Sequence, residues 1–197
     1  MSPPASLLGL LRQGARRPDL ASLLAELSPA ERVEQVLAVT GRRVDALFDA
    51  AADGPPATIE DFVPADAPPE TTIIFEGRNS LPLFSRFQKR FARLGSGEIV
   101  GYNHQPWSPL VGPGYFVVKP AGPAGPLAGH LFLDYVARPG GIPAGWPPFR
   151  PNEGLLSRPV WADMKDYMRR VAPGVLVGKA YRRGWPAGYF FVLVRAD

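Results

Sequence analysis

The chain has 197 residues, of which 46% are hydrophobic and 20% are charged. This length suffices for one substantial core, or for one domain with a helical extension, and the composition excludes wholesale disorder. The absence of cysteine excludes disulfides, thiolate catalysis and cysteine-ligated metal sites. No apolar run approaches the roughly 20 residues of a membrane span, and the N-terminus lacks the pattern of a secretory signal. We therefore expect a soluble, cytoplasmic protein.

The net charge of +4 is unevenly distributed along the chain. Residues 1–70 carry six arginines and eleven acidic residues, whereas residues 71–197 carry sixteen basic and seven acidic residues. Eighteen of the 22 basic residues are arginines, a bias that GC-rich codon usage also produces. A nucleic-acid partner is therefore not favoured, and we expect the acidic N-terminal part to attract the basic remainder.

Helices are predicted throughout the N-terminal segment, residues 1–52. Leu-rich patterns indicate short helices at 5–12 and 19–27. A longer helix is predicted to start at Ser28, because Ser28 and Glu31 match a capping box, and its apolar stripe continues to about Ala52. The apolar faces of these helices also offer a contact for a homo-oligomer.

Residues 53–70 contain five prolines and several acidic residues, which is typical of an extended linker. Within it, Ile59 and Phe62 are apolar and are expected to contact the body of the protein. The linker leads into a predicted domain at 71–197.

That domain is predicted to have an α+β fold, with a mainly antiparallel curved sheet and packed helices in the order β-α-β-β-β-α-β-β. Alternating or β-branched runs indicate the strands, and apolar stripes with helical spacing indicate the helices. The predicted strands are 71–76, 98–104, 114–119, 129–136, 175–182 and 188–195, and the predicted helices are 81–94 and 159–171. A Pro- and Gly-rich loop covers 138–154.

Both histidines lie in predicted strands. Alternation places His104 on one side of its strand, and His130 on the same side of another strand as Asp134. Asp134 is a carboxylate within the apolar run HLFLDYV, a placement that costs free energy unless the carboxylate is paired. Together these three residues are candidates for general acid–base catalysis. Satisfaction of the same groups by backbone and solvent is the structural alternative.

Aromatic residues near the Pro-rich loops predict a ligand-binding pocket. Tyr102 and Tyr115 are expected to contact the ligand, and Trp107 and Trp146 to form the rim. Simple packing of the loops is the alternative. No metal is expected, because the two histidines lack the HxH or HExxH spacing of a metal site. No cofactor is expected either, and the sequence has no Gly-rich phosphate loop.

A basic stripe is predicted on the outer side of the helix at 81–94. Its members are spaced i, i+3, i+4 and i+7, and they are Arg86, Lys89, Arg90 and Arg93. Such a stripe binds anions or is simply solvated.

Three functions are open on this evidence. The first is binding of a small apolar or aromatic ligand in a pocket between the sheet and the helices at 81–94 and 159–171. The second is a cofactor-free enzyme that uses the His, Asp and Tyr residues in that pocket. The third is an anion- or partner-binding module that uses the basic stripe.

Overall fold

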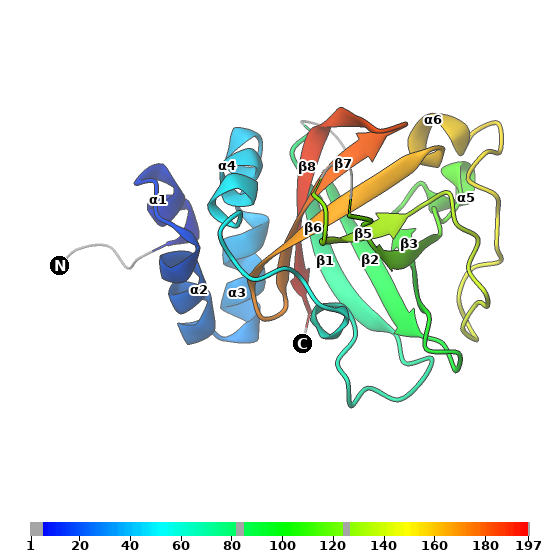
Figure 1. Ribbon diagram of the computed structural model, residues 1–197, viewed down its shortest axis with the longest axis horizontal. Coiled ribbons are helices and arrows are strands. Elements are labelled where there is room, and N and C mark those ends of the chain that lie inside the picture. The colour runs from blue at the N-terminus through cyan, green and yellow to red at the C-terminus, as the bar shows by residue number, and fades with distance from the viewer. Residues whose placement is uncertain (1–5, 82–84, 124–126, 197) are drawn as a thin grey trace.

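The computed structural model describes residues 6–81, 85–123 and 127–196, and its centre is a closed barrel of eight antiparallel strands (Figure 1). Each strand pairs with its neighbour in the chain, and β8 pairs with β1 to close the barrel. The strands are β1 (Ile73–Asn79), β2 (Arg86–Arg93), β3 (Ile99–His104), β4 (Phe116–Pro120), β5 (Leu131–Asp134), β6 (Met164–Ala172), β7 (Val175–Arg182) and β8 (Trp185–Arg195). The fold is therefore α+β, as predicted, but the sheet closes on itself and is not an open curved sheet.

The chemistry of the turns explains the tight pairing of the last strands. Arg183 and Gly184 join β7 to β8 with φ values of 52° and 84°. Two successive residues with positive φ are typical of the type I′ turn, whose twist matches that of a two-stranded hairpin. At the preceding connection, from β6 to β7, Gly174 has a φ of 70°.

Two predicted helices are wrong, because residues 86–93 and 164–172 form strands β2 and β6. Residues four apart share a side in a strand as well as in a helix, so Phe87 and Phe91 fit both patterns. Between them lies Lys89, which interrupts the apolar alternation that would have indicated a strand. Among the described residues of the predicted domain at 71–197, only α5 (Ser108–Val111) and α6 (Arg158–Trp161) are α-helical. Residues 82–84 of the predicted helix lie outside the described residues.

Four helices precede the barrel: α1 (Leu7–Arg12), α2 (Arg17–Glu26), α3 (Pro29–Leu37) and α4 (Arg42–Ala50). The capping box at the start of α3 is confirmed, since the Ser28 side chain accepts from the backbone of Glu31 while the Glu31 carboxylate accepts from the backbone of Ser28. The prediction of one helix as far as Ala52 is wrong. Gly41, with a φ of 55°, separates α3 from α4.

The N-terminal helices cover one outer side of the barrel (Figure 1). Apolar residues on the outer faces of β6, β7 and β8 pack against leucines and valines of the helices. Hydrogen bonds fasten this contact: the Arg169 guanidinium donates to the carbonyl of Phe48 at 2.8 Å, and that of Arg78 donates to the carbonyl of Leu37 at 2.7 Å. The helices therefore pack on the barrel of their own chain, and the homo-oligomer contact stays a prediction.

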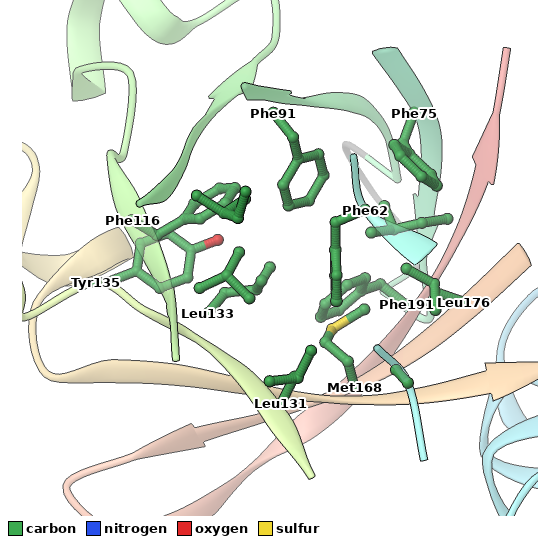
Figure 2. Close-up of a cluster of buried hydrophobic side chains, with 14 of the residues drawn as sticks. Phe62, Phe75, Phe91, Phe116, Leu131, Leu133, Tyr135, Met168, Leu176 and Phe191 are labelled. Carbon is green, nitrogen blue, oxygen red and sulfur yellow. The ribbon is translucent and has the colours of Figure 1, made fainter. Parts of the chain in front are cut away.

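One end of the barrel is closed by the segment that follows the 3₁₀ turn η1 (Ile59–Asp61). Phe62 is fully buried, and its ring centroid lies 5.3 Å from that of Phe91 inside the barrel. Figure 2 shows Phe62 among the inward-facing side chains of several strands. The carboxylate of Asp61 pairs with Arg170 of β6 at 3.1 Å and fixes the turn. Phe62 thus plugs this end, in agreement with the predicted contact between the linker and the body.

We predict that Phe62→Ala destabilises the fold by about 3–5 kcal/mol, because it leaves a cavity in the closed end of the barrel. Urea unfolding followed by far-UV circular dichroism measures the change. Leu155→Ala is the matched control, since Leu155 is 91% exposed and its loss should cost no more than about 0.5 kcal/mol. Equal stability of the two variants would contradict the role given to Phe62.

Candidate functional site

The other end of the barrel contains a cavity of about 540 Å³. Helices α5 and α6 lie at its mouth, where they contribute Leu110 and Val160. Deeper walls come from inward-facing residues of the strands. The described lining residues are Asn79, Leu81, Phe87, Lys89, Asn103, Gln105, Trp107, Leu110, Val111, Tyr135, Val160, Trp161, Met164, Asp166, Tyr189 and Phe191. The lining is mostly apolar, and Leu110 at the rim is 63% exposed, so the mouth is accessible to solvent.

Four polar side chains meet at the buried wall of this cavity: Lys89, Asn103, Tyr135 and Asp166. Lys89 Nζ donates to Asn103 Oδ1 at 2.8 Å, to Asp166 Oδ2 at 3.2 Å and to the Tyr135 hydroxyl. The Tyr135 hydroxyl in turn donates to Asp166 Oδ2 at 3.1 Å. We call these four residues the Lys89 cluster. All three donors of the ammonium group therefore have partners.

Strand pairing brings the Lys89 cluster together. Lys89 of β2 lies directly opposite Asn103 of β3, and both side chains face inward. Tyr135 directly follows β5 and Asp166 lies on β6, which pairs with β5. The amide of Asn103 also donates to the carbonyl of Gly114 at 2.9 Å, so its orientation is fixed from a third direction. The cluster thus links opposite parts of the barrel wall across the interior.

Burial sets the electrostatics of the Lys89 cluster. The side chains of Lys89 and Asp166 are only 3% and 5% exposed. Desolvation lowers the pKa of Lys89, although the nearby Asp166 carboxylate opposes this change. Desolvation likewise raises the pKa of Tyr135 well above its ordinary value, so the phenol is a hydrogen-bond donor at neutral pH. The cluster combines a cation, a carboxylate and a neutral hydroxyl in a largely buried wall of the cavity.

Aromatic rings surround the ammonium group. Its nitrogen lies 4.9 Å from the ring centroid of Phe191, 5.0 Å from that of Phe116 and 5.1 Å from that of Tyr135. The ring of Phe87 is 5.6 Å away. Figure 2 shows Phe116, Tyr135 and Phe191 within the barrel. Ring faces attract a cation at these distances, and more strongly when water is excluded, so the site is built for a positive charge at this position.

Of the predicted pocket residues, Trp107 lines the cavity, whereas Tyr102, Tyr115 and Trp146 lie outside the barrel wall. Tyr102 is on the outward side of β3, with its ring centroid 4.8 Å from that of Trp146 and 5.6 Å from that of Tyr115. The Pro-rich loop packs over this outer face, and its Asn152 donates to the carbonyls of Tyr115 and Tyr135. Tyr102, Tyr115 and Trp146 thus hold the loop against the barrel and are not in the described lining of the cavity.

The three predicted catalytic residues are not brought together. Alternation grouped them correctly within each strand, but the shared side faces outward: His104 is exposed at the end of β3, and Asp134 pairs with Lys119 at 3.0 Å. His130 directly precedes β5, is half-buried, and is not in the described lining of the cavity. Strand β4 separates β3 from β5. Burial, followed by the charge of Arg90, lowers the pKa of His104, but among the described residues no hydrogen bond or ion pair joins these three.

The predicted basic stripe is also wrong as a single outward face, because a strand alternates sides. Arg86 and Arg90 face outward, and Arg90 donates to the hydroxyl of Tyr102 at 3.2 Å. Lys89 faces the barrel interior. The guanidinium of Arg93, at the far end of β2, donates to the carbonyl of Val63 at 3.1 Å. The four cations therefore do not form one anion-binding surface.

Sequence reasoning missed Asn103, Tyr135 and Asp166. One usable signal was a charged residue midway between two apolar residues four apart, as in Phe87-Lys89-Phe91 and Met164-Asp166-Met168. Such a pattern is also that of a strand whose inward row contains one charge.

Metal-ligand clusters and membrane-spanning helices are both absent from the described residues. No three His, Asp or Glu side chains there are grouped so that they could hold a metal ion. None of the described helices is both long and apolar enough to cross a membrane.

Comparison with known proteins gives no match: no family model fits the sequence, and no curated protein or solved structure resembles the chain significantly.

We predict that Lys89→Met destabilises the protein by about 3–5 kcal/mol, because it leaves the buried Asp166 carboxylate without its counter-charge. The double variant Lys89→Met, Asp166→Leu should recover most of this loss, since it removes both charges. Urea unfolding of the wild type, both single variants and the double variant gives the coupling energy. Additive losses in this cycle would show that the two charges do not interact.

Proposed function

We propose that the protein binds a small, largely apolar ligand inside the barrel. The observation that carries the proposal is the cavity of about 540 Å³, whose apolar walls surround a few converging polar groups. Sites for small molecules have this composition: apolar surface supplies affinity, and a few fixed polar groups orient the ligand. Barrels of eight strands are also of the size that holds one small ligand. Relative to the sequence-based proposal, the site moves from between sheet and helices to the interior of the barrel.

The charge of the cavity favours a neutral ligand. Lys89 and Asp166 are the charged residues in its described lining, and their charges cancel. A ligand carboxylate beside Lys89 would also face Asp166, and a ligand cation beside Asp166 would face Lys89. Either charge would have to be desolvated without a free counter-charge, which is costly. A carbonyl or hydroxyl group meets no such obstacle, because it can exchange hydrogen bonds with Lys89 or Tyr135.

The two other functions have less support. An acid–base enzyme built on His104, His130 and Asp134 would need these residues in one pocket, and they lie on the outer side of the barrel. An anion-binding module would need Arg86, Lys89, Arg90 and Arg93 on one face. The described geometry offers neither arrangement.

We expect the neutral fluorescent probe N-phenyl-1-naphthylamine to bind with one-to-one stoichiometry and increased emission. Val160→Trp should weaken this binding ~10-fold or more, because it fills the mouth of the cavity and a loss of about 1.4 kcal/mol suffices for that factor. Fluorescence titration measures both.

Leu156→Trp is the matched control, since it adds the same ring nearby at a residue that is 53% exposed and outside the described cavity lining. It should bind the probe as the wild type does. Equal weakening by both substitutions, or no binding to the wild type, would overturn the proposal.

A further inference from the structure

The amine of Lys89 is the strongest nucleophile that the described cavity lining presents. Neither cysteine nor serine is among those residues, and a tyrosine with a raised pKa is a poor nucleophile at neutral pH. From its position we propose that Lys89 forms a Schiff base with a small apolar aldehyde that enters the barrel. This inference rests on the proposed ligand-binding function and names the chemical class of the ligand.

The site has the parts that such a reaction needs. Asp166 Oδ2 lies 3.2 Å from Lys89 Nζ and can accept the proton whose departure frees the nitrogen lone pair. The hydroxyl of Tyr135 and the amide of Asn103 are within hydrogen-bonding range of each other at 3.1 Å. The Tyr135 hydroxyl also accepts a hydrogen bond from Lys89 Nζ, so it is close enough to donate to an aldehyde oxygen that arrives there. The base, the nucleophile and the hydrogen-bond donor are held close together, which lowers the entropic cost of bringing them to the aldehyde.

The reaction balances without any further reagent. Lys89 Nζ passes one proton to Asp166 and attacks the aldehyde carbon, so that a C–N bond forms and the π bond of the carbonyl breaks. The carbonyl oxygen then takes a second proton from the nitrogen, which gives a carbinolamine. Asp166 returns its one proton to the hydroxyl group, the C–O bond breaks, and the oxygen leaves as water. The products are a protonated imine and one water molecule. Nothing is oxidised or reduced.

Formation of the imine does not change the charge on the Lys89 nitrogen. The ammonium group and the protonated imine each carry one positive charge on the same nitrogen. Asp166 is the counter-ion to both, and the rings of Phe87, Phe116, Tyr135 and Phe191 surround both. The buried environment therefore does not have to accept a new charge or give one up, which would be the main cost of covalent chemistry there.

The remaining three lysines provide an internal comparison. Lys119, Lys165 and Lys179 lie on the outer side of the barrel, where Lys119 is 43% exposed and pairs with Asp134. Lys165 and Lys179 lie beside the outward rings of Phe132 and Phe190. Desolvation lowers the pKa of Lys89, which increases the fraction of reactive neutral amine, and no other lysine is in the cavity lining.

The test is to incubate the wild-type protein with cinnamaldehyde, reduce any imine with sodium cyanoborohydride, and map the modified lysines by peptide mass spectrometry. Because the chain has no cysteine, thiol adducts of this aldehyde cannot form. We expect the reduced adduct on Lys89 at ~10-fold or greater yield than on any other lysine. This comparison needs no variant, so it does not depend on whether a variant folds.

Lys89→Arg is the matched variant, since it keeps the positive charge beside Asp166 but cannot form an imine. It should lose the adduct at residue 89 while the three outer lysines keep their low yields. Circular dichroism checks that this variant is folded.

Displacement of N-phenyl-1-naphthylamine by cinnamyl alcohol, which has no electrophilic carbon, separates this inference from the proposed function. If the alcohol displaces the probe but Lys89 is modified no more than the outer lysines, the Schiff base is overturned and ligand binding stands. In that case the pair of Lys89 and Asp166 is structural only. If neither the probe nor the alcohol binds and Lys89 is not modified, both proposals fail together.

Discussion

Lys89 and Asp166 carry opposite charges and lie 3.2 Å apart inside the barrel. The arrangement of the interior depends on stabilising this buried ion pair. Removing either ion from water costs several kcal/mol, so the pair is tolerated only where further groups compensate. Tyr135 and Asn103 complete the hydrogen bonds of the ammonium group, and the ring centroid of Phe116 lies 5.0 Å from its nitrogen. Replacing a buried ion pair with apolar residues of similar volume is often neutral or stabilising. The Lys89 cluster lines the cavity, and this position is consistent with the proposed binding of a ligand.

One end of the barrel is filled by side chains and the other end contains the cavity, and this difference places the candidate site at the second end. At one end Phe62 enters between the strands and packs on Phe91, so that this half of the interior is a solid core (Figure 2). At the other end the short helices α5 and α6 lie at the mouth and leave the space below them open. The N-terminal helices pack on the outer wall along β6, β7 and β8, away from that mouth, and they add an apolar layer without entering the barrel (Figure 1).

Sequence reasoning was most reliable where the inward row of a strand has no charged residue in its middle. The strands that became β1, β3, β4, β5, β7 and β8 were predicted, as was the capping box at Ser28. Both strands mistaken for helices carry the charged members of the cluster, Lys89 on β2 and Asp166 on β6. A charge in the inward row removed the period-two signal, and the apolar residues on either side, four apart, then matched a helix. The two charged residues of the Lys89 cluster thus concealed the strands on which they lie. Sequence alternation also cannot decide which side of a strand faces inward, which is why Tyr102, His104 and Asp134 were assigned to a pocket although they face outward.

A crystal structure of the protein with N-phenyl-1-naphthylamine bound would test the central claim most directly, because it locates the ligand and not merely its affinity. We expect density for the probe inside the barrel, below α5 and α6, with its amine or rings within contact distance of Lys89 and Tyr135. Density only on the outer face, against Tyr102 and Trp146, would contradict the claim that the barrel interior is the binding site. So would an interior in which α5 and α6 close over the Lys89 cluster and leave no space for a ligand.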